Sequence, residues 1–220
     1  GVKNETFATS KGSDSYDGGL GTDTITLSGM VGVTETGSTA SAAAVINLGS
    51  TPVTGASVVG KTGNYLAGGV TTVDSGTAAY SFGTDSTLNS SKIKTITSIE
   101  NIVGSSGKDY IVGSSSNNRI DSGANNDYVL GGDGADTFVF SAVAANADTI
   151  GDFTTAQDRI ELSKTAFSAL VGSAGAHTLS TDFYSSTTAV TASTSTRAEA
   201  IIYDQTTGNI YYNTDGNTAG

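Results

Sequence analysis

Residues 104–139 read GSSGKDYIV, GSSSNNRID, SGANNDYVL and GGDGADTFV, a nine-residue unit that occurs four times without a change of register. The sixth place of each unit holds an aspartate or an asparagine, and the eighth place holds a large apolar residue. The sixth-place residues are Asp109, Asn118, Asp127 and Asp136, and the eighth-place residues are Ile111, Ile120, Val129 and Phe138. A run of unrelated Gly/Asp hairpin turns is the alternative, but such turns match the pattern by accident only once or twice. The sequence therefore indicates a true repeat.

Each unit is long enough for one turn and one very short strand. Its last three residues span about 10 Å as a strand, at roughly 3.3 Å per residue. Because side chains alternate along a strand, the eighth place points to one side by itself, so each unit buries one large apolar residue. The preceding residues must turn the chain, and glycine and asparagine tolerate the left-handed backbone of tight turns. Two units should therefore make one flat coil.

Stacked coils bring acidic side chains close together. Asp109 and Asp127 fall on one edge of successive coils, and Asn118 and Asp136 fall on the other. Two carboxylates at the roughly 4.8 Å spacing of neighbouring strands repel each other by about 1–3.5 kcal/mol, for effective dielectric constants of about 80 to 20. A hard cation removes this repulsion, and calcium accepts carboxylate and carbonyl oxygens together. The pattern therefore predicts several calcium ions along the coil edges.

The same unit recurs outside the main array. Residues 1–27 contain the units GVKNETFA, TSKGSDSYD and GGLGTDTIT, the first of them truncated, so we expect the chain to begin inside a coil. The unit TITSIENIV joins the main array in register, which then covers residues 95–139. The sixth places in these four units are Glu5, Asp14, Asp23 and Glu100, and the eighth places are Phe7, Tyr16, Ile25 and Ile102.

Residues 28–94 interrupt the repeat, and residues 140–220 follow it. In the interruption, AAAVINL at 42–48, ASVV at 56–59 and AAYSF at 78–82 are expected strands of a small sheet or hairpin layer outside the coil. Its residue types leave open whether it is a covering loop or a binding surface for a glycan or another subunit.

The C-terminal part, 140–220, is expected to cap the coil, where an exposed strand edge would invite pairing with other chains. The stretch 147–163 predicts a strand, a turn and a strand, and 198–216 predicts a hairpin around residues 205–208. KTAFSALVG at 164–172 predicts a short amphipathic helix. All the parts are expected to form one domain.

The composition fits a sheet protein held together by metal. The chain has 21 acidic and 10 basic residues, and its formal charge of −11 argues against nucleic acid or an anionic membrane as partner. It has no cysteine, so metal would take the place of disulfides. The sequence shows no transmembrane run and no N-terminal signal peptide. We therefore expect either a piece of a longer chain or export by a route that reads another signal.

The sequence offers no catalytic site. It has no HExxH zinc motif, and His177, its single histidine, is expected in a loop or strand. Asp109 and Asp127 could be imagined as a glycosidase pair, but a ladder of repeated carboxylates differs from one distinct catalytic pair. There is also no cysteine nucleophile, phosphate loop or dinucleotide motif. We predict that this segment is not an enzyme.

Four stretches give the chain a family resemblance: SIENIVGS at 98–105, ADTFVF at 135–140, DTIGDFTTAQDRIELS at 148–163 and IIYDQTTGNIYYNTDG at 201–216. They resemble the C-terminal RTX (haemolysin-type) calcium-binding domain of serralysin-type proteases and of many type I-secreted surface proteins and adhesins. The unit itself matches the RTX pattern G-G-x-G-x-D-x-U-x. The resemblance implies an all-β fold, a right-handed parallel β-roll (β-helix) with calcium along both edges.

The resemblance also implies calcium ligands, because in this family one turn supplies its second, fourth and sixth places and the turn eighteen residues on supplies its first, third and sixth. Carried over, one site would use Ser105, Gly107, Asp109, Ser122, Ala124 and Asp127. The next would use Ser114, Ser116, Asn118, Gly131, Asp133 and Asp136. A site clamping the two arrays together would use Gly21, Asp23, Ser98 and Glu100, and Asp148 would serve a last site. Asn118 stands where the family has aspartate, which is expected to weaken its site.

A calcium-driven folding module is the leading functional hypothesis. Extracellular calcium modules bind with dissociation constants of about 10⁻⁴–10⁻³ M, so the chain would stay unfolded in the cytosol. It would pass through the type I secretion machinery and fold outside the bacterial cell or at its surface. Two alternatives remain open: a surface-layer or adhesin domain that binds a glycan or its own copies, and the passive C-terminal tail of a secreted hydrolase.

Overall fold

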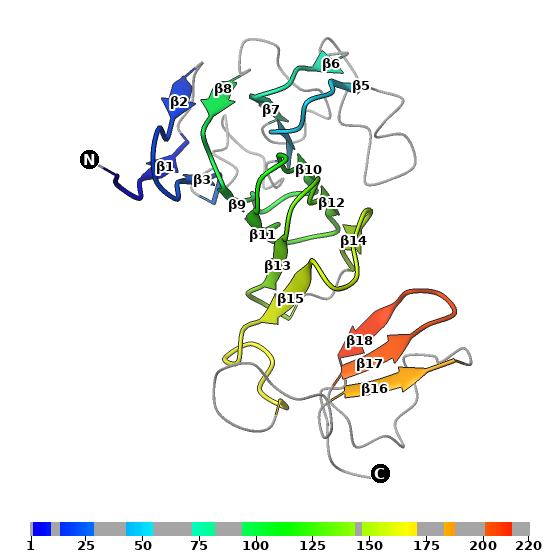
Figure 1. Cartoon of the computed structure of the whole chain (residues 1–220). Coiled ribbons are helices and arrows are strands. Elements are labelled where there is room, and N and C mark those ends of the chain that lie inside the picture. The colour runs from blue at the N-terminus through cyan, green and yellow to red at the C-terminus, as the bar shows by residue number, and fades with distance from the viewer. Residues whose placement is uncertain are drawn as a thin grey trace, which may run out of the picture. The chain divides into compact units, whose positions relative to one another are not determined.

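The computed structural model describes residues 2–9, 14–28, 43–54, 72–81, 94–143, 147–170, 183–187 and 201–212. The chain divides into two compact units, Gly1–Glu161 and Leu162–Gly220. Within the described residues the regular secondary structure consists of β-strands alone (Figure 1), which confirms the predicted all-β class. None of the described segments forms a helix long and apolar enough to cross a membrane.

The main array is a coil whose consecutive strands alternate between two sheets and pair in parallel with one another within each sheet (Figure 1). Its strands are β9 (Asn101–Val103), β10 (Tyr110–Val112), β11 (Arg119–Asp121), β12 (Tyr128–Leu130), β13 (Thr137–Phe140), β14 (Thr149–Ile150) and β15 (Arg159–Leu162). The odd-numbered ones belong to a six-stranded sheet and the even-numbered ones to a seven-stranded sheet. Ile120 is paired with Ile102 on one side and with Phe138 on the other, eighteen residues away each time. This is the strand arrangement of a parallel β-roll, with the predicted register.

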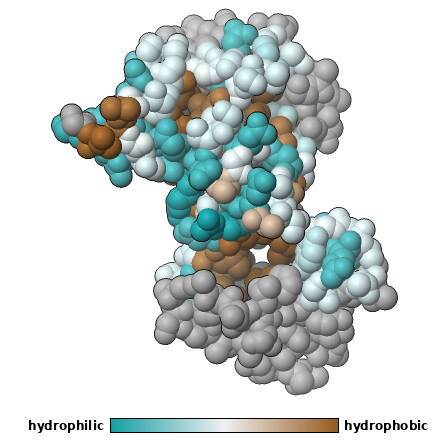
Figure 2. All heavy atoms as spheres, viewed as in Figure 1, coloured by the Kyte–Doolittle hydropathy of each residue, from teal (hydrophilic) through white to brown (hydrophobic). Residues whose placement is uncertain are grey.

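The first array stacks directly on the main one. Its strands are β1 (Thr6–Ala8), β2 (Ser15–Asp17) and β3 (Thr24–Thr26). In the six-stranded sheet β3 pairs in parallel with β9, and in the seven-stranded sheet β2 pairs in parallel with β8 (Lys94–Thr97). Figure 2 shows hydrophobic surface at this N-terminal end, where Val2 and Leu20 are exposed, and mainly hydrophilic surface over the turns of the repeat.

The interruption contributes strands to the coil's own sheet. β4 (Ala43–Asn47) confirms the strand expected at 42–48, and it lies in the seven-stranded sheet between β10 and β7 (Thr77–Ser81). It pairs in parallel with β10 and antiparallel with β7, which in turn pairs antiparallel with β8. The structure thus differs from the expected separate layer.

Burial explains why β4 joins the sheet. Ala44 and Ile46 are buried on one side of the strand, and Val45 is buried on the other. A strand with two apolar faces fits inside a sheet that is covered on both sides. The outer face is covered by a small hairpin of β5 (Val53–Thr54) and β6 (Thr72–Val73). The segment 56–59 lies outside the described residues.

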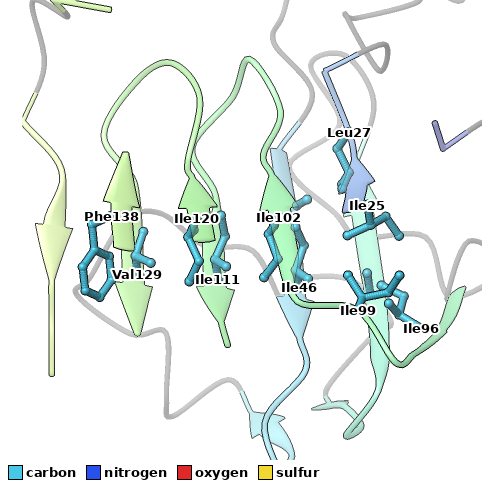
Figure 3. Packing of buried hydrophobic residues seen from close by; sticks show 12 residues of the cluster. Ile25, Leu27, Ile46, Ile96, Ile99, Ile102, Ile111, Ile120, Val129 and Phe138 are labelled. Atoms are coloured by element: carbon cyan, nitrogen blue, oxygen red, sulfur yellow. The ribbon is translucent and has the colours of Figure 1, made fainter. Parts of the chain in front are cut away.

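The core of the coil is a double row of eighth-place side chains (Figure 3). Ile102, Ile120 and Phe138 of one sheet face Ile46, Ile111 and Val129 of the other. All six side chains are buried. Five of them stand at eighth places and confirm the predicted inward position, and the sixth, Ile46, is contributed by β4. Burying a side chain of this size contributes about 1.5–3 kcal/mol, so each coil adds only a small amount of apolar stabilisation.

The segment after the array is partly as predicted. The strand, turn and strand at 147–163 is confirmed by β14 and β15. In the second unit, β17 (Ile201–Asp204) and β18 (Ile210–Tyr212) form the predicted antiparallel hairpin, and β16 (Phe183–Ser186) pairs in parallel with β17. The capping of the coil by this unit stays a prediction.

The helix predicted at 164–172 is wrong for its described part, residues 164–170, which form consecutive turns. The Phe167 N–H donates to the Ser163 carbonyl (2.8 Å), and the Leu170 N–H donates to the Phe167 carbonyl (3.1 Å). Nucleating a helix is costly, and an isolated helix shorter than about 12 residues is marginal in water, so a segment this short depends on the packing of its apolar face. Phe167 is buried instead by packing edge-on against Tyr212, with ring centroids 4.9 Å apart.

Candidate calcium sites

The sixth-place residues form a hydrogen-bonded ladder along each edge of the coil. In each step the N–H of a sixth-place residue donates to the carboxylate at the corresponding place of the next coil. On one edge Asp109 donates to Asp127 Oδ1 (2.7 Å) and Asp127 donates to Asp148 Oδ1 (3.0 Å). On the other edge Asn118 donates to Asp136 Oδ1 (2.8 Å). The structure therefore brings together the sixth places of both predicted central sites.

The first array continues the second of these ladders. Glu5 N–H donates to Asp23 Oδ1 (2.6 Å), and Asp23 N–H donates to Glu100 Oε2 (2.8 Å). Asp23 and Glu100, predicted to clamp the arrays, are thus in direct contact. Ser98 lies nearby, because a Cβ added to Gly18 would meet the Ser98 carbonyl. Gly21 lies against the Lys3 carbonyl of the neighbouring coil.

Three carboxylate oxygens in these ladders have no hydrogen-bond donor among the described residues. They are Asp23 Oδ2, Asp127 Oδ2 and Asp136 Oδ2, which we call the unpaired oxygens. All three aspartates are 0% exposed. A buried ionised carboxylate is costly unless a partner compensates it, so each unpaired oxygen fits a cation ligand.

Small first-place residues keep space and carbonyl oxygens beside the carboxylates. A Cβ added to Gly104 would lie 2.7 Å from Asp109 Oδ2 and against the Ser122 carbonyl. A Cβ added to Gly113 would lie 2.7 Å from Asn118 Oδ1 and against the Gly131 carbonyl. Carboxylate and carbonyl oxygens of neighbouring coils thus converge on the same narrow spaces.

The other predicted ligands lie along the same turns. The Ser105 carbonyl faces Gly123 and accepts a hydrogen bond from the Ala124 N–H (3.4 Å). The carbonyls of Ser114 and Ser116 face Gly132 and Gly134 of the next coil. Gly107 is buried, whereas Asp133 is exposed. Their roles as ligands stay predictions.

The donor set suits calcium better than a metal that needs several charged side chains. Across the described parts of the chain, no three acidic, histidine or cysteine side chains are grouped as a metal site. Calcium takes six to eight oxygens and accepts backbone carbonyls and hydroxyls beside one or two carboxylates. A site built from two neighbouring turns therefore needs no third acid.

Burial changes the acidity of the ladder aspartates. Burial raises the pKa of Asp109 to about 7, against hydrogen bonds from Ser105 and Ala44 that lower it. Burial, with the charges of Asp109 and Asp148, raises the pKa of Asp127 to about 8. Burial also raises the pKa of Asp136, and so do the charges of Asp158, Asp152 and Asp133. Without a cation, Asp109 and Asp127 therefore stay protonated to a higher pH than an exposed aspartate does, and the pKa of Asp136 is shifted in the same direction.

The calcium-free fold should therefore lose stability as the pH rises from about 4 to about 8. An aspartate of an unfolded chain has a pKa of about 3.9, below the values of about 7 and about 8 for Asp109 and Asp127 in the fold. Between these pKa values the folded protein holds protons that the unfolded chain has released, and this difference changes the free energy of unfolding with pH. The resulting stabilisation is complete below about pH 4 and is lost as the pH rises through about 7 to 8.

Circular dichroism of the calcium-stripped protein at about pH 5 and about pH 8 measures this effect, with more β structure expected at about pH 5. In saturating calcium the pH dependence should reverse, so that the protein is more stable at about pH 8 than at about pH 5, because protons compete with calcium for the carboxylates at low pH. A calcium-stripped protein whose β structure increases as the pH rises from about 5 to about 8 would contradict the expectation.

Two acidic residues of the ladders were missed by sequence reasoning. Asp158 Oδ1 accepts from the Asp136 N–H (2.9 Å), and Asp152 accepts from the N–H groups of Gly131 (2.8 Å) and Gly132 (2.9 Å). Asp158 lies 22 residues after Asp136, whereas the nine-residue repeat predicts a spacing of eighteen, so the repeat pattern did not include Asp158. Asp158 lies two residues before Ile160, which is the separation of the sixth and eighth places in the repeat unit, and this signal could have identified it. Asp152 carries no repeat signal.

Comparison with known families agrees with this geometry. The family model described as Peptidase M10 serralysin C terminal matches residues 78–215, more than half of the chain. The model described as RTX calcium-binding nonapeptide repeat (4 copies) matches residues 4–26. The search of curated proteins found no match. RTX repeats bind several calcium ions per array, and the serralysin C-terminal region is a non-catalytic tail. The chain therefore belongs to the serralysin C-terminal family and is a calcium-binding RTX domain.

Proposed function

We propose that this domain is a module that folds when calcium binds, after export by the type I secretion machinery. In the cytosol, where calcium is scarce, the chain stays largely unfolded, and it folds in the extracellular space or at the bacterial cell surface. The observation that supports this proposal most directly is the set of three unpaired oxygens, each on an aspartate with no exposed surface.

The energetics support a folding role for the ions. A ligand that binds only the folded state at 100 times its dissociation constant contributes about 2.7 kcal/mol. Three such sites, one for each unpaired oxygen, would contribute about 8 kcal/mol, which lies within the usual stability of a whole domain of about 5–15 kcal/mol. Because most units bury only one or two large apolar side chains, losing this contribution would leave the coil unfolded.

The proposed ligands come from neighbouring coils. Asp127, with carbonyls of Ser105, Gly107, Ser122 and Ala124, would hold one ion beside Asp109, whose own two carboxylate oxygens already accept hydrogen bonds. Asp23 with Glu100 would join the arrays. Asp136 would bind an ion together with groups of its neighbouring coils. We also propose that the segment has no catalytic activity of its own.

Circular dichroism with and without calcium tests the proposal. The protein should show a mostly disordered spectrum in chelator and a β spectrum in millimolar calcium. Magnesium at the same concentration is the control for ionic strength, because it demands tighter octahedral geometry and keeps its waters. A full β spectrum in chelator near neutral pH would contradict the proposal.

The family match favours a second proposal about the intact protein. Because the matching family is described as the C terminus of a serralysin peptidase, we propose that this module follows a secreted hydrolase domain. A coding region upstream of Gly1 that encodes no catalytic domain would contradict this. A glycan-binding or self-associating surface gains no support from the described strands of the interruption, whose apolar side chains are buried.

A further inference from the structure

The turns of the coil fall into two groups according to the residue at their second place. Besides the turn of Glu100, whose second-place residue Ile96 lies within β8, six turns have both this residue and their sixth-place side chain described. Glycine stands at the second place in three of them, and serine or threonine stands there in the other three. The glycines are Gly19, Gly123 and Gly132, and the hydroxyl residues are Ser105, Ser114 and Thr154.

In the serine and threonine turns, the second-place N–H closes onto the turn's own sixth-place side chain. Ser105 N–H donates to Asp109 Oδ2 (2.6 Å), and its hydroxyl donates to Asp109 Oδ1 (2.7 Å). Thr154 N–H donates in the same way to Asp158 Oδ2 (2.7 Å). The protein itself therefore supplies donors to these sixth-place oxygens. We call these the closed turns.

In the glycine turns, the second-place N–H points elsewhere. The three glycines have positive φ angles of 74°, 102° and 94°. Their N–H groups donate to the side chains of Asp17 (3.2 Å), Asp121 (3.3 Å) and Asp152 (2.9 Å). The sixth-place residues of these same turns carry the three unpaired oxygens. We call these the open turns.

The backbone explains this division. Glycine adopts a positive φ at no steric cost, whereas other residues with a Cβ avoid it. A positive φ turns the second-place N–H away from the carboxylate, and a negative φ turns it inward. Serine adds its hydroxyl as a further donor. The residue type at one position thus decides whether the sixth-place carboxylate keeps an oxygen without a donor.

We infer that the second-place residue selects which turns of this chain hold calcium through their own carboxylate. Open turns offer the unpaired oxygens of Asp23, Asp127 and Asp136 to a cation. Closed turns replace that cation with hydrogen bonds from the chain. This inference rests on the calcium binding proposed above and adds a rule for where the ions lie.

Asn118 extends this rule to one junction between coils. Its side-chain amide oxygen, Oδ1, accepts a hydrogen bond from the Ser114 N–H (2.7 Å). The amide nitrogen could not take this place, because it is itself a donor. The amide nitrogen must then face the other way, and it donates to the Glu100 carbonyl of the neighbouring coil (2.9 Å). The amide therefore joins these two coils without metal, in a closed turn where the family usually has an aspartate.

The test counts bound calcium ions in matched variants by native mass spectrometry and equilibrium dialysis. Gly19→Ser should lose one ion, because a serine closes the turn onto Asp23. Gly208→Ser is the matched control. Gly208 has a φ of 77°, close to that of Gly19, and an added Cβ meets nothing within 4 Å at either position. The control should bind the wild-type number of ions.

Ser105→Gly tests the rule in the opposite direction and removes atoms, so it introduces no clash. It should open the turn of Asp109 and gain one ion. Asp127→Asn should lose one ion and shows that single ions are resolved. A wild-type protein that binds no calcium would overturn the calcium-binding proposal itself. If Asp127→Asn loses an ion while Gly19→Ser keeps all or Ser105→Gly gains none, the second-place rule alone is overturned.

Discussion

Replacing Ile111 with alanine should lower the free energy of unfolding of the calcium-loaded protein by about 2–5 kcal/mol. Ile111 is 0% exposed and lies at the centre of the double row, paired with Ile46 on one side and Val129 on the other (Figure 3). Coils above and below are held by their own hydrogen bonds, so the structure cannot easily collapse into the cavity. The lost contacts and the remaining cavity both contribute to the loss.

Urea unfolding at a fixed saturating calcium concentration measures this loss. Ile210→Ala is the matched control, because Ile210 is 47% exposed on β18 and its truncation removes few contacts. Its expected effect is below about 1 kcal/mol. Similar losses for the two variants would show that the eighth-place row does not carry the apolar stability of the coil.

Gly104→Ala should separate two coils and weaken both stability and calcium binding. The new Cβ would press against the Ser122 carbonyl and lie 2.7 Å from Asp109 Oδ2. The first obstacle is backbone, so it cannot swing aside like the end of a side chain. Overpacking of this kind costs typically about 1–3 kcal/mol. We expect the upper part of that range and at least a roughly tenfold lower calcium affinity, since 1.4 kcal/mol corresponds to a factor of 10.

Thermal unfolding and calcium titration of this variant provide the two readouts. Ser115→Ala is the control, because Ser115 is exposed at the third place of the following turn. It should leave both quantities near the wild-type values. An alanine at position 104 that leaves stability and affinity unchanged would mean that neighbouring coils are not in the close contact described here.

The coil could be predicted from the repeat because each unit specifies its own strand and turn within nine consecutive residues. An apolar residue at every eighth place and an acid at every sixth fix strand position, inward direction and register within nine residues. The pairs of Ile102 with Ile120 and of Ile111 with Val129 follow from this count alone. Both ladders also follow from it up to Asp136, where the spacing increases.

The position of β4 could not be predicted, because it depends on a distant partner. Ala44 N–H donates to Asp109 Oδ1 (2.7 Å) across a separation of 65 residues. β4 has alanine where the coil has an acid, so the repeat pattern does not detect it. A strand that is apolar on both faces has many possible partners, and only the assembled sheet selects one.

Extra residues precede Asp148 and Asp158, which form the last step of each ladder. Asp148 was expected from the family resemblance, but Asp158 was missed. These carboxylates lie 21 and 22 residues after their partners, instead of eighteen. The helix expected at 164–172 failed for a different reason. The spacing of its apolar residues is met equally well by a turn that buries Phe167 alone.

The two strands β7 and β4 have a mechanical consequence for the coil. They lie between β8 and β10 in the seven-stranded sheet, whereas β3 and β9 are direct neighbours in the six-stranded sheet. At roughly 4.8 Å per strand, one wall of the coil is about 10 Å wider than the other at this level. Because the two walls differ in width, we expect the stack of coils to bend at this level. The two arrays are therefore hydrogen-bonded to each other directly in the narrow wall and only through β7 and β4 in the wide one.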